Sequence, residues 1–423
     1  MKKVLLKSAV ILHPESAFHN QKADVLITEG KIAAIGNTDI AAEDALIIDA
    51  EGKFLSPGFF DLNANFGEPG YETREDLESG SAAAVAGGFT GVAVHPNTNP
   101  PIHSKAQVSY IVNQTKGGIV EVRPFGSISY NREGKDLAEL YDMHKAGALA
   151  FTDGTRPIAD SGLMSRALLY AKGFGGRIVS FPEDTCIAGK GMMNEGEVST
   201  YLGMKGIPAL AEELLISRDL YLAEYNDAPV HFATISTAQG VDLVRKAKQK
   251  GLKVTCDVAA HHLVLSEKAL EGFDSNYKVK PPLRTDDDVQ ALKEGLLDGT
   301  IDAIVSQHNP QEIEYKNVEF EIASFGIIAL QTVLPLALRA GLSAEVIVEK
   351  LAINPRKILG IEVPTLSEGK EANLVLFDAE KFWTFNSATN KSKSNNSPFF
   401  NTELKGRVEF ICNNGKFLTC KYG

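Results

Sequence analysis

The sequence predicts an α/β protein: a (β/α)8 TIM-like barrel with a small β-sandwich domain formed by both ends of the chain. Short β-type runs occur at both ends, and between them eight apolar runs alternate with amphipathic helical stretches. Eight strand–helix units in about 300 residues are typical of a TIM barrel. We expect residues 1–55 and 358–423 to form the composite β domain and residues 56–357 to form the barrel.

The two ends have similar β-type composition. The amino end contains VLLKSAVIL, ADVLITEG, KIAAIG and ALIIDAEGKFL, separated by Gly, Asn and Asp turns. The carboxyl end contains ANLVLFDA and GRVEFICNNGKFLTC, in which Asn413-Asn414-Gly415 signals a hairpin. The Ser/Asn/Lys-rich stretch KFWTFNSATNKSKSNN, with the following SPFFNTELKG, predicts a long surface loop whose lysines face solvent.

The central region supplies the barrel elements. Its candidate strands are FLSPGFFDLNANF, TGVAVHPN, EVRPFGSISYN, ALAFTDG, RIVSFPED, PVHFATIST, KVTCDVAAHH and IDAIVSQHNP. Helical stretches between them include TREDLESGSAAAVAGG, DSGLMSRALLYAKGFG, IPALAEELLISRDLYLAEYN, GVDLVRKAKQKG and TDDDVQALKEGLLDG. Because a barrel of this kind carries its chemistry at the carboxyl ends of the strands, we expect the functional residues there.

Composition limits the kind of partner. The chain has 423 residues, 44% of them hydrophobic, which is enough for a large core. Its formal net charge of -11 argues against nucleic acid. No apolar run reaches the roughly 20 residues of a membrane span, and MKKVLLKSAVILHPES reads as a first strand, not a signal peptide. The four scattered cysteines fit a reducing compartment, so we expect a cytoplasmic protein.

Two amides end the first barrel strand, in the stretch DLNANF. Asn63 and Asn65 are two residues apart, so their side chains project to the same side, a geometry that suits two metal-binding histidines. Histidines do occur at other strand ends, but no two of them form an H-x-H or H-x-x-x-H pair on one element. The spacing alone therefore predicts no metal site, and each lone His is first a candidate packing residue.

Long segments carry a resemblance to a known family. They begin with SPGFFDLNANFGEPGYETREDLESGSAAAVAGGFTGVAVHPNTNPP and continue in order through AFTDGTRPIADSGLMSRAL, VHFATISTAQGVDLVRKAK, NYKVKPPLRTDDDVQALKEGLLDGTIDAIVSQHNP and SEGKEANLVLF. Together these segments resemble the dihydroorotases of the amidohydrolase superfamily over nearly the whole chain. The resemblance implies an amidohydrolase-type barrel and a place in pyrimidine biosynthesis.

The resemblance also implies where the reactive centre would lie. Active members hold divalent metal, zinc among them, with His-x-His after strand one, Asp or a carboxylated Lys after strand four, His after strands five and six, and Asp after strand eight. In this chain those positions fall on Asn63, Asn65, Asp153, Phe181, Thr234 and Gln307. Only Asp153 keeps a ligand type of the family.

The substrate positions are mixed. Asn97 matches a family position that contacts the ligand, whereas the family's arginine falls on Gly67 and one of its asparagines on Lys280. Lys280 can supply a point charge but not the bidentate fork of a guanidinium. We predict a substrate pocket containing Asn97, Lys280, Arg284 and His308.

Loss of the metal ligands bears directly on catalysis. A hydrolase of this kind uses the metal to lower the pKa of water from about 15.7 to about 7. Amide and hydroxyl oxygens are weak ligands beside imidazole and carboxylate, and Phe181 offers none. The amide of Gln307 cannot act as the general base that a carboxylate would be. The sequence therefore predicts no working metal centre and no cofactor.

Three functions remain open at this stage. The first is a catalytically inactive homologue kept as a structural or regulatory partner, of aspartate carbamoyltransferase, as the resemblance implies, or of a second copy of itself. The second is an active cyclic amidohydrolase with unusual ligands, such as Asp153 with His231, His308 or Glu183. Strand alternation sends His231 and Thr234 to opposite faces, which weakens that alternative. The third is a sensor of a pyrimidine-pathway small molecule.

Overall fold

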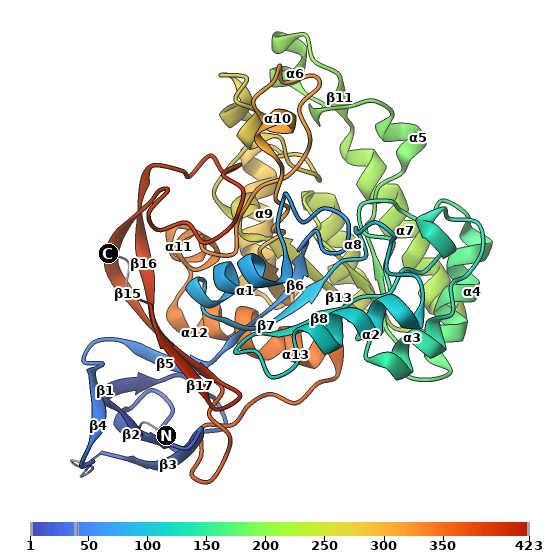
Figure 1. Ribbon diagram of the computed structural model, residues 1–423. Coiled ribbons are helices and arrows are strands. Elements are labelled where there is room, and N and C mark those ends of the chain that lie inside the picture. Colours follow the sequence, from blue (N-terminus) through green and yellow to red (C-terminus); the bar gives the residue numbers. More distant parts are fainter. Residues whose placement is uncertain (1–2, 38–39, 41, 421–423) are drawn as a thin grey trace.

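A closed barrel of parallel strands forms the centre of the molecule (Figure 1). The computed structural model describes residues 3–37, 40 and 42–420. The barrel strands pair in the order β6–β7–β8 and β9–β12–β13–β14. They are β6 (Phe59–Ala64), β7 (Phe89–Val94), β8 (Glu121–Pro124), β9 (Ile178–Ser180), β12 (Val230–Phe232), β13 (Val254–Ala259) and β14 (Ala303–Val305).

Isolated bridges complete the ring. Phe151 bridges both Gly126 and Ile178, which places the predicted ALAFTDG strand between β8 and β9. A parallel bridge between Ala64 and His308 joins the end of β6 to the chain just beyond β14. All eight predicted strands thus take part, and the predicted barrel is confirmed.

Helices surround this barrel, and the five named helical stretches of the sequence form α1, α4, α7, α8 and α9 (Figure 1). The longer ones are α1 (Leu77–Ala86), α2 (Lys105–Gln114), α3 (Leu140–Ala146), α4 (Ser161–Lys172), α7 (Ala209–Asn226), α8 (Ala238–Gln249), α9 (Asp286–Leu297) and α11 (Val333–Arg339). Shorter elements are α5 (Thr185–Ala188), α6 (Glu197–Leu202), α10 (Ile313–Lys316), α12 (Ala344–Val348), α13 (Asn354–Leu359), β10 (Met193–Asn194), β11 (Gly206–Ile207) and 3-10 or π turns at Tyr130–Arg132, Ala260–Leu263, Glu267–Leu270, Ser275–Tyr277 and Glu349–Ile353.

Local sequence explains where these helices begin. Thr285 caps α9 by accepting from the backbone N–H of Asp288, whose carboxylate accepts in return from the Thr285 N–H. Asp160 caps α4 through a 2.6 Å bond from the Leu163 N–H. Each cap satisfies donors that the first helical turn would leave without a partner.

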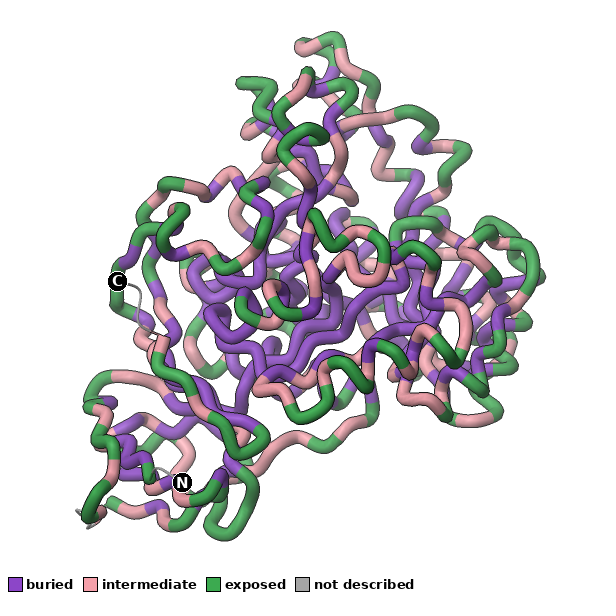
Figure 2. The backbone as a smooth tube through the Cα atoms, in the orientation of Figure 1, coloured by how far each residue is buried: buried purple, intermediate pink, exposed green. Residues whose placement is uncertain are grey.

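Burial follows the two sides of the barrel wall. In Figure 2 the central strands are coloured as buried along their length. One cluster of apolar side chains fills the barrel and includes Phe60, Leu62, Ala93, Phe125 and Val179. A second, larger cluster packs the wall against the surrounding helices and includes Phe59, Phe89, Ile178, Phe232 and Val258. Strand alternation separates the two sets.

Strands from both chain ends share one further sheet, as the fold class predicted. Its order is β17–β16–β15–β5–β1–β2–β3, with β4 paired to β1. The Asn414-Gly415 turn, with φ of 50° and 70°, forms the predicted hairpin between β16 and β17. The strands are β1 (Lys3–Ile11), β2 (Lys22–Thr28), β3 (Lys31–Gly36), β4 (Ala45–Asp49), β5 (Phe54–Pro57), β15 (Leu374–Phe385), β16 (Thr402–Asn413) and β17 (Lys416–Thr419).

Strand β15 belongs to two cores at once. Leu374 and Leu376 lie in the apolar core of the small domain, whereas Val375 and Phe377 lie in the core between barrel and helices. This division follows from the two-residue period of a strand. The proposed boundaries at residues 55 and 358 stay a prediction, because β15 joins the two parts.

Asp61 of β6 is hydrogen-bonded to Ser306, the residue directly after β14, and so links the first barrel strand to the last. Its carboxylate accepts from the N–H of Ser306 at 2.8 Å and from the Ser306 hydroxyl at 2.5 Å. Complete burial raises the pKa of Asp61 to about 7. Because the folded state favours the protonated carboxyl, this group's contribution to stability is present below pH 4 and is lost as pH rises through 7.

We therefore expect Asp61→Asn to stabilise the protein more at pH 8 than at pH 5. The amide keeps an acceptor for Ser306 and removes a buried charge, so the gain at pH 8 is on the order of 4 kcal/mol. Thermal midpoints of both chains at the two pH values check this. An equal difference at both values would mean that the folded protein holds Asp61 ionised.

Within residues 3–37, 40 and 42–420, no helix is long and apolar enough to cross a membrane. The cysteines are all free thiols: Cys186 is exposed, Cys256 and Cys412 are buried, and Cys420 is partly buried.

Candidate functional site

A cavity of about 240 Å³ opens at the carboxyl ends of the barrel strands. It brings together four of the predicted metal positions and two of the predicted substrate positions, and its wall is mostly amide and aromatic in character. The lining residues are Asn63, Asn65, His95, Asn97, Gly154, Thr155, Phe181, Lys280, Gln307, Asn309, Phe325 and Gly326. This is where a TIM barrel carries its reactive groups.

Hydrogen bonds fix the amides of this cavity. Asn97 Nδ2 donates to Asn65 Oδ1 at 2.5 Å, and Asn65 Nδ2 donates to the carbonyl of His308 at 3.3 Å. Asn63 Nδ2 donates to the hydroxyl of Thr234 at 3.1 Å, which brings a fifth predicted metal position to the cavity edge. The prediction that Asn63 and Asn65 project together is therefore confirmed.

Two of the predicted positions have unusual backbone conformations. Thr234 and Gln307 have φ values of 56° and 51°, in the left-handed region that a β-branched residue such as Thr seldom adopts. Such conformations cost about 1–3 kcal/mol each and cluster at functional sites. They hold both side chains at the mouth although neither carries a strong metal donor.

Gly67 occupies the position of the family's arginine. Its φ is +57°, and a Cβ built there would lie 2.5 Å from the carbonyl oxygens of Glu75 and Tyr71. A side chain at position 67 therefore requires the surrounding backbone to move. The arginine that the resemblance places at this position, with its guanidinium able to bind a carboxylate through two hydrogen bonds, has no room in this loop.

Charge in the cavity is largely neutralised. Lys280 Nζ lies 2.7 Å from Glu183 Oε1, so the predicted point charge already has a partner. His95 Nε2 donates to the carbonyl of Leu62 at 3.3 Å, and burial lowers the pKa of His95 to about 4. At neutral pH its imidazole carries no charge.

Asp153 keeps the family's residue type but faces away from the cavity. Its carboxylate accepts from the N–H groups of Ile128 and Ser129 at 2.8 and 3.0 Å and from the Ser129 hydroxyl. Burial raises the pKa of Asp153 above its ordinary value. These bonds use the carboxylate to hold the loop after β8, while its neighbours Gly154 and Thr155 line the cavity.

Arg284 does not line this cavity, contrary to the pocket predicted from the sequence. It is fully buried, donates to Ser236 Oγ at 3.0 Å and to Asn194 Oδ1 at 2.9 Å, and lies 3.6 Å from Glu212 Oε2. The guanidinium therefore links β10 to α7, because Asn194 belongs to β10 and Glu212 to α7.

His308 also points away from the cavity. Its Nδ1 accepts from the Ala329 N–H at 3.1 Å, so its Nε2 donates to Glu75 Oε2 at 3.2 Å. Only its backbone carbonyl reaches Asn65. The predicted pocket thus retains Asn97 and Lys280 and loses the two side chains whose partners lie deeper in the fold.

Glu75 connects the mouth to the loop between β15 and β16. Its buried carboxylate accepts from His308, from the hydroxyls of Ser79 and Ser392 and from the Lys393 N–H. Burial alone would raise the pKa of Glu75, but these donors hold it below its ordinary value. The loop between β15 and β16 was expected to be solvated. It is instead held against the barrel, because Ser392 and Lys393 donate two of these hydrogen bonds to Glu75.

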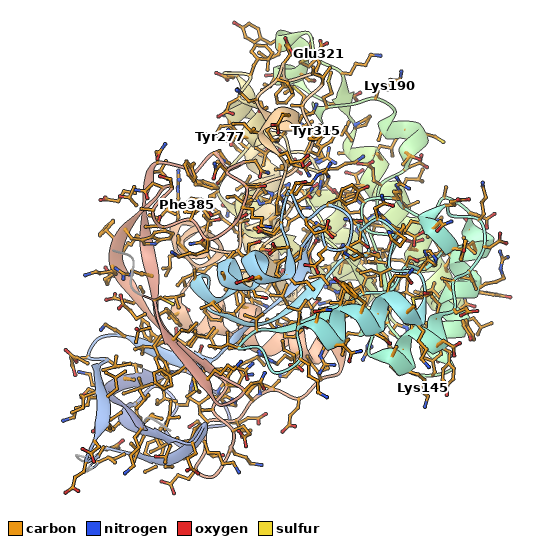
Figure 3. All side chains as sticks on the ribbon, viewed as in Figure 1. Lys145, Lys190, Tyr277, Tyr315, Glu321 and Phe385 are labelled. Carbon is orange, nitrogen blue, oxygen red and sulfur yellow. The ribbon has the colours of Figure 1, made fainter. Side chains whose placement is uncertain are left out.

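Phe325 and Gly326 form a wall that the spacing of the sequence did not reveal. Lys316 Nζ donates to the carbonyl oxygens of Ser324 and Gly326 at 3.0 and 3.1 Å, which holds this segment in place. Figure 3 shows Tyr315, beside Lys316 in the chain, together with Tyr277 and Glu321 in the upper part of the molecule. Asn309 also lines the cavity. Its place at a strand end, in the segment SQHNP, is a sequence feature that could have identified it.

His231, the alternative ligand, lies at the opposite end of the barrel. It borders a second cavity with Arg177, Lys253 and Asp302, which precede or begin their strands, and its Nε2 lies 2.9 Å from Asp257 Oδ2. Among the residues that the structure describes, no three His, Cys, Asp or Glu side chains gather where they could hold a metal ion. The alternative ligand set, Asp153 with His231, His308 or Glu183, does not come together among the described residues.

The fold and the position of the cavity are those of the amidohydrolase family. The Amidohydrolase family model matches residues 192–418. The chain is similar to the L-hydantoinase (dihydropyrimidinase) from Arthrobacter aurescens, with a TM-score of 0.86 and 25% identity over 100% of this chain and 97% of that one. Its fold also matches that of the dihydropyrimidinase from Brevibacillus agri, with a TM-score of 0.82 and 22% identity over 99% and 95% of the two chains.

Sequence comparison narrows the assignment. The Dihydro-orotase-like model matches residues 52–240. The chain is 43% identical to a dihydroorotase of Geobacter metallireducens over 98% of both chains, and 42% identical to one of Acetivibrio thermocellus over 97% and 98%. The chain belongs to the dihydroorotase family.

Proposed function

We propose that this chain is a dihydroorotase-like protein of pyrimidine biosynthesis that does not catalyse the reaction and acts as a structural or regulatory partner, for example of aspartate carbamoyltransferase. One observation carries the proposal: the positions of the family's metal ligands face the cavity as Asn63, Asn65, Phe181 and Gln307, with Thr234 at its edge. Neutral amides and a phenyl ring do not fit a zinc ion, which takes imidazole, thiolate or carboxylate.

The remaining groups do not supply another route to an activated water. Gln307 donates its Nε2 to the Lys280 carbonyl at 2.7 Å and offers no basic atom near neutrality. Glu183 is a carboxylate at the mouth, but it forms an ion pair with Lys280. The buried Asp153 is engaged by Ile128 and Ser129.

We expect the purified chain to contain far less than one zinc per molecule and to show no turnover of dihydroorotate or carbamoyl-aspartate above background. Metal analysis of protein prepared without chelator and an assay in both directions check this. A family member with the complete His-x-His set, prepared in parallel, is the control. Stoichiometric zinc with turnover would support the alternative, an active cyclic amidohydrolase with atypical ligands.

The partner role is tested separately. Aspartate carbamoyltransferase and this chain, mixed at micromolar concentration, should co-elute in gel filtration, and separate elution counts against that partner. The cavity supports a second candidate, binding of a pyrimidine-pathway small molecule, because the buried Asn97 Oδ1 has no hydrogen-bond partner within the described chain. Calorimetry with dihydroorotate tests it, and absence of heat at millimolar ligand removes it.

A further inference from the structure

The cavity at the amino ends of the barrel strands, opposite the mouth, has a volume of about 320 Å³. Ile358 of α13 both lines it and belongs to the apolar cluster that fills the barrel, so α13 closes the barrel at this end. A cavity of this size can hold a small organic molecule. The lining residues are Arg177, Pro229, Val230, His231, Leu252, Lys253, Val254, Thr255, Asp302, Asn354, Lys357 and Ile358.

The charge of this cavity is opposite to that of the chain. The whole chain has a formal net charge of -11, yet the lining contains one carboxylate, Asp302, and three cations, Arg177, Lys253 and Lys357. Both oxygens of Asp302 already accept from Lys248 Nζ at 2.7 Å. The ammonium of Lys253 is also paired, since it lies 3.0 Å from Asp227 Oδ1. Two positive charges therefore remain without a counter-charge.

These two charges, on Arg177 and Lys357, border the same end of α13. A Cβ built on Gly360 would lie 3.8 Å from Arg177 Nη2, and Lys357 belongs to the last turn of that helix. Neither side chain makes a hydrogen bond or an ion pair with any residue that the structure describes. A helix end carries only about half a negative charge, which offsets a fraction of two cations. An anion in the cavity would supply the rest.

The uncharged polar groups of the lining are already engaged. Asn354 Nδ2 donates to the carbonyl of Asp302 at 2.9 Å and to Glu349 Oε1 at 3.0 Å. Thr255 Oγ1 lies 2.9 Å from His231 Nδ1. The remaining surface is apolar and comes from Pro229, Val230, Leu252, Val254 and Ile358. A ligand therefore meets two free cations and otherwise mainly apolar side chains.

We propose that this cavity binds a phosphate monoester with a small apolar body. Near pH 7 such an ester carries a charge of about -1.5 to -2, which matches two unpaired cations, whereas a carboxylate leaves one of them without a partner. The guanidinium of Arg177 can bind two phosphate oxygens at once. The apolar lining covers the body of the ligand. Because this cavity lies at the other end of the barrel, the site is independent of whether the mouth is catalytic.

Calorimetry with phenyl phosphate, at concentrations up to about 1 mM, tests the ligand class. We expect saturable heat at one molecule per chain. Inorganic phosphate lacks the apolar body and should bind about ten-fold more weakly. Benzoate lacks the second charge and should lose about as much. Absence of heat with phenyl phosphate overturns the proposal, and so does equal affinity for inorganic phosphate or for benzoate.

Variants of the two unpaired cations locate the binding. Arg177→Gln and Lys357→Gln should each weaken binding of phenyl phosphate about ten-fold or more, because each removes a charge-assisted contact. Neither should shift the thermal midpoint without ligand, since neither side chain has a partner in the described chain. The matched control is Lys253→Gln, in the same cavity but already paired, which should change the affinity about two-fold or less.

The outcome that contradicts this location is equally definite. Binding that survives in the double variant Arg177→Gln, Lys357→Gln would place the ester elsewhere. Binding that is lost in Lys280→Gln would place it at the mouth, whose lysine lies in the other cavity. Either result overturns the proposal, and neither depends on the zinc content or the turnover of the chain.

Discussion

A chain carrying Asn63→His, Asn65→His, Phe181→His, Thr234→His and Gln307→Asp is expected to bind one or two zinc ions per molecule, whereas we expect the native chain to bind far less than one. Four of these positions line one cavity, and the fifth, Thr234, donates no strong ligand but lies 3.1 Å from Asn63. Because the left-handed backbone at Thr234 and Gln307 already holds both side chains at the mouth, His and Asp enter it with little rearrangement.

Zinc per chain by elemental analysis is the measurement. Added zinc should also raise the thermal midpoint of the five-site variant and leave that of the native chain unchanged, because only a ligand that binds the folded state stabilises it. The pair Phe181→His and Thr234→His alone provides the matched control, since two imidazoles among amides hold zinc weakly. A folded five-site variant without zinc would mean that these positions do not converge closely enough.

Regained zinc need not bring regained activity. Position 67 would still lack the family's arginine, and a Cβ there meets the carbonyl oxygens of Glu75 and Tyr71 at 2.5 Å. We therefore expect the five-site variant to bind metal and to turn over dihydroorotate slowly, with poor substrate affinity.

Arg284→Ala should be strongly destabilising, by about 3–5 kcal/mol, because it leaves the buried carboxylate of Glu212 without its counter-charge. It also removes the donors to Ser236 and Asn194. The thermal midpoint and the urea midpoint measure the loss. A residue that only contacted substrate would leave both midpoints unchanged.

The double variant Arg284→Met with Glu212→Gln sharpens this test. Removing both charges should recover part of the stability lost in Arg284→Ala, since a buried pair is often replaceable by neutral groups of similar size. Arg245→Ala is the surface control, because its partner Asp298 is partly exposed and such pairs contribute about 1 kcal/mol or less. Equal losses in both single variants would contradict the buried role of Arg284.

Local patterns predicted most of the fold and half of the site. The period of two in β6 placed Asn63 and Asn65 together, and turn residues at Asn414-Gly415 located a hairpin, because both features depend on neighbours in the sequence. Arg284 and His308 were misplaced, because their orientation is set by Glu212 and Glu75, which lie far away in the chain. The ion pair of Lys280 with Glu183 could not be predicted either, because these two residues also lie far apart in the chain.

The shared sheet has a consequence for how the chain is made. Strand β5 ends at Pro57 and pairs on one side with β15, which begins at Leu374. During synthesis the amino-terminal strands must therefore wait, with one hydrogen-bonding edge open, until nearly the entire polypeptide has left the ribosome. Nascent chains halted within the barrel would expose that edge, so chaperone dependence should end only when the last hairpin emerges.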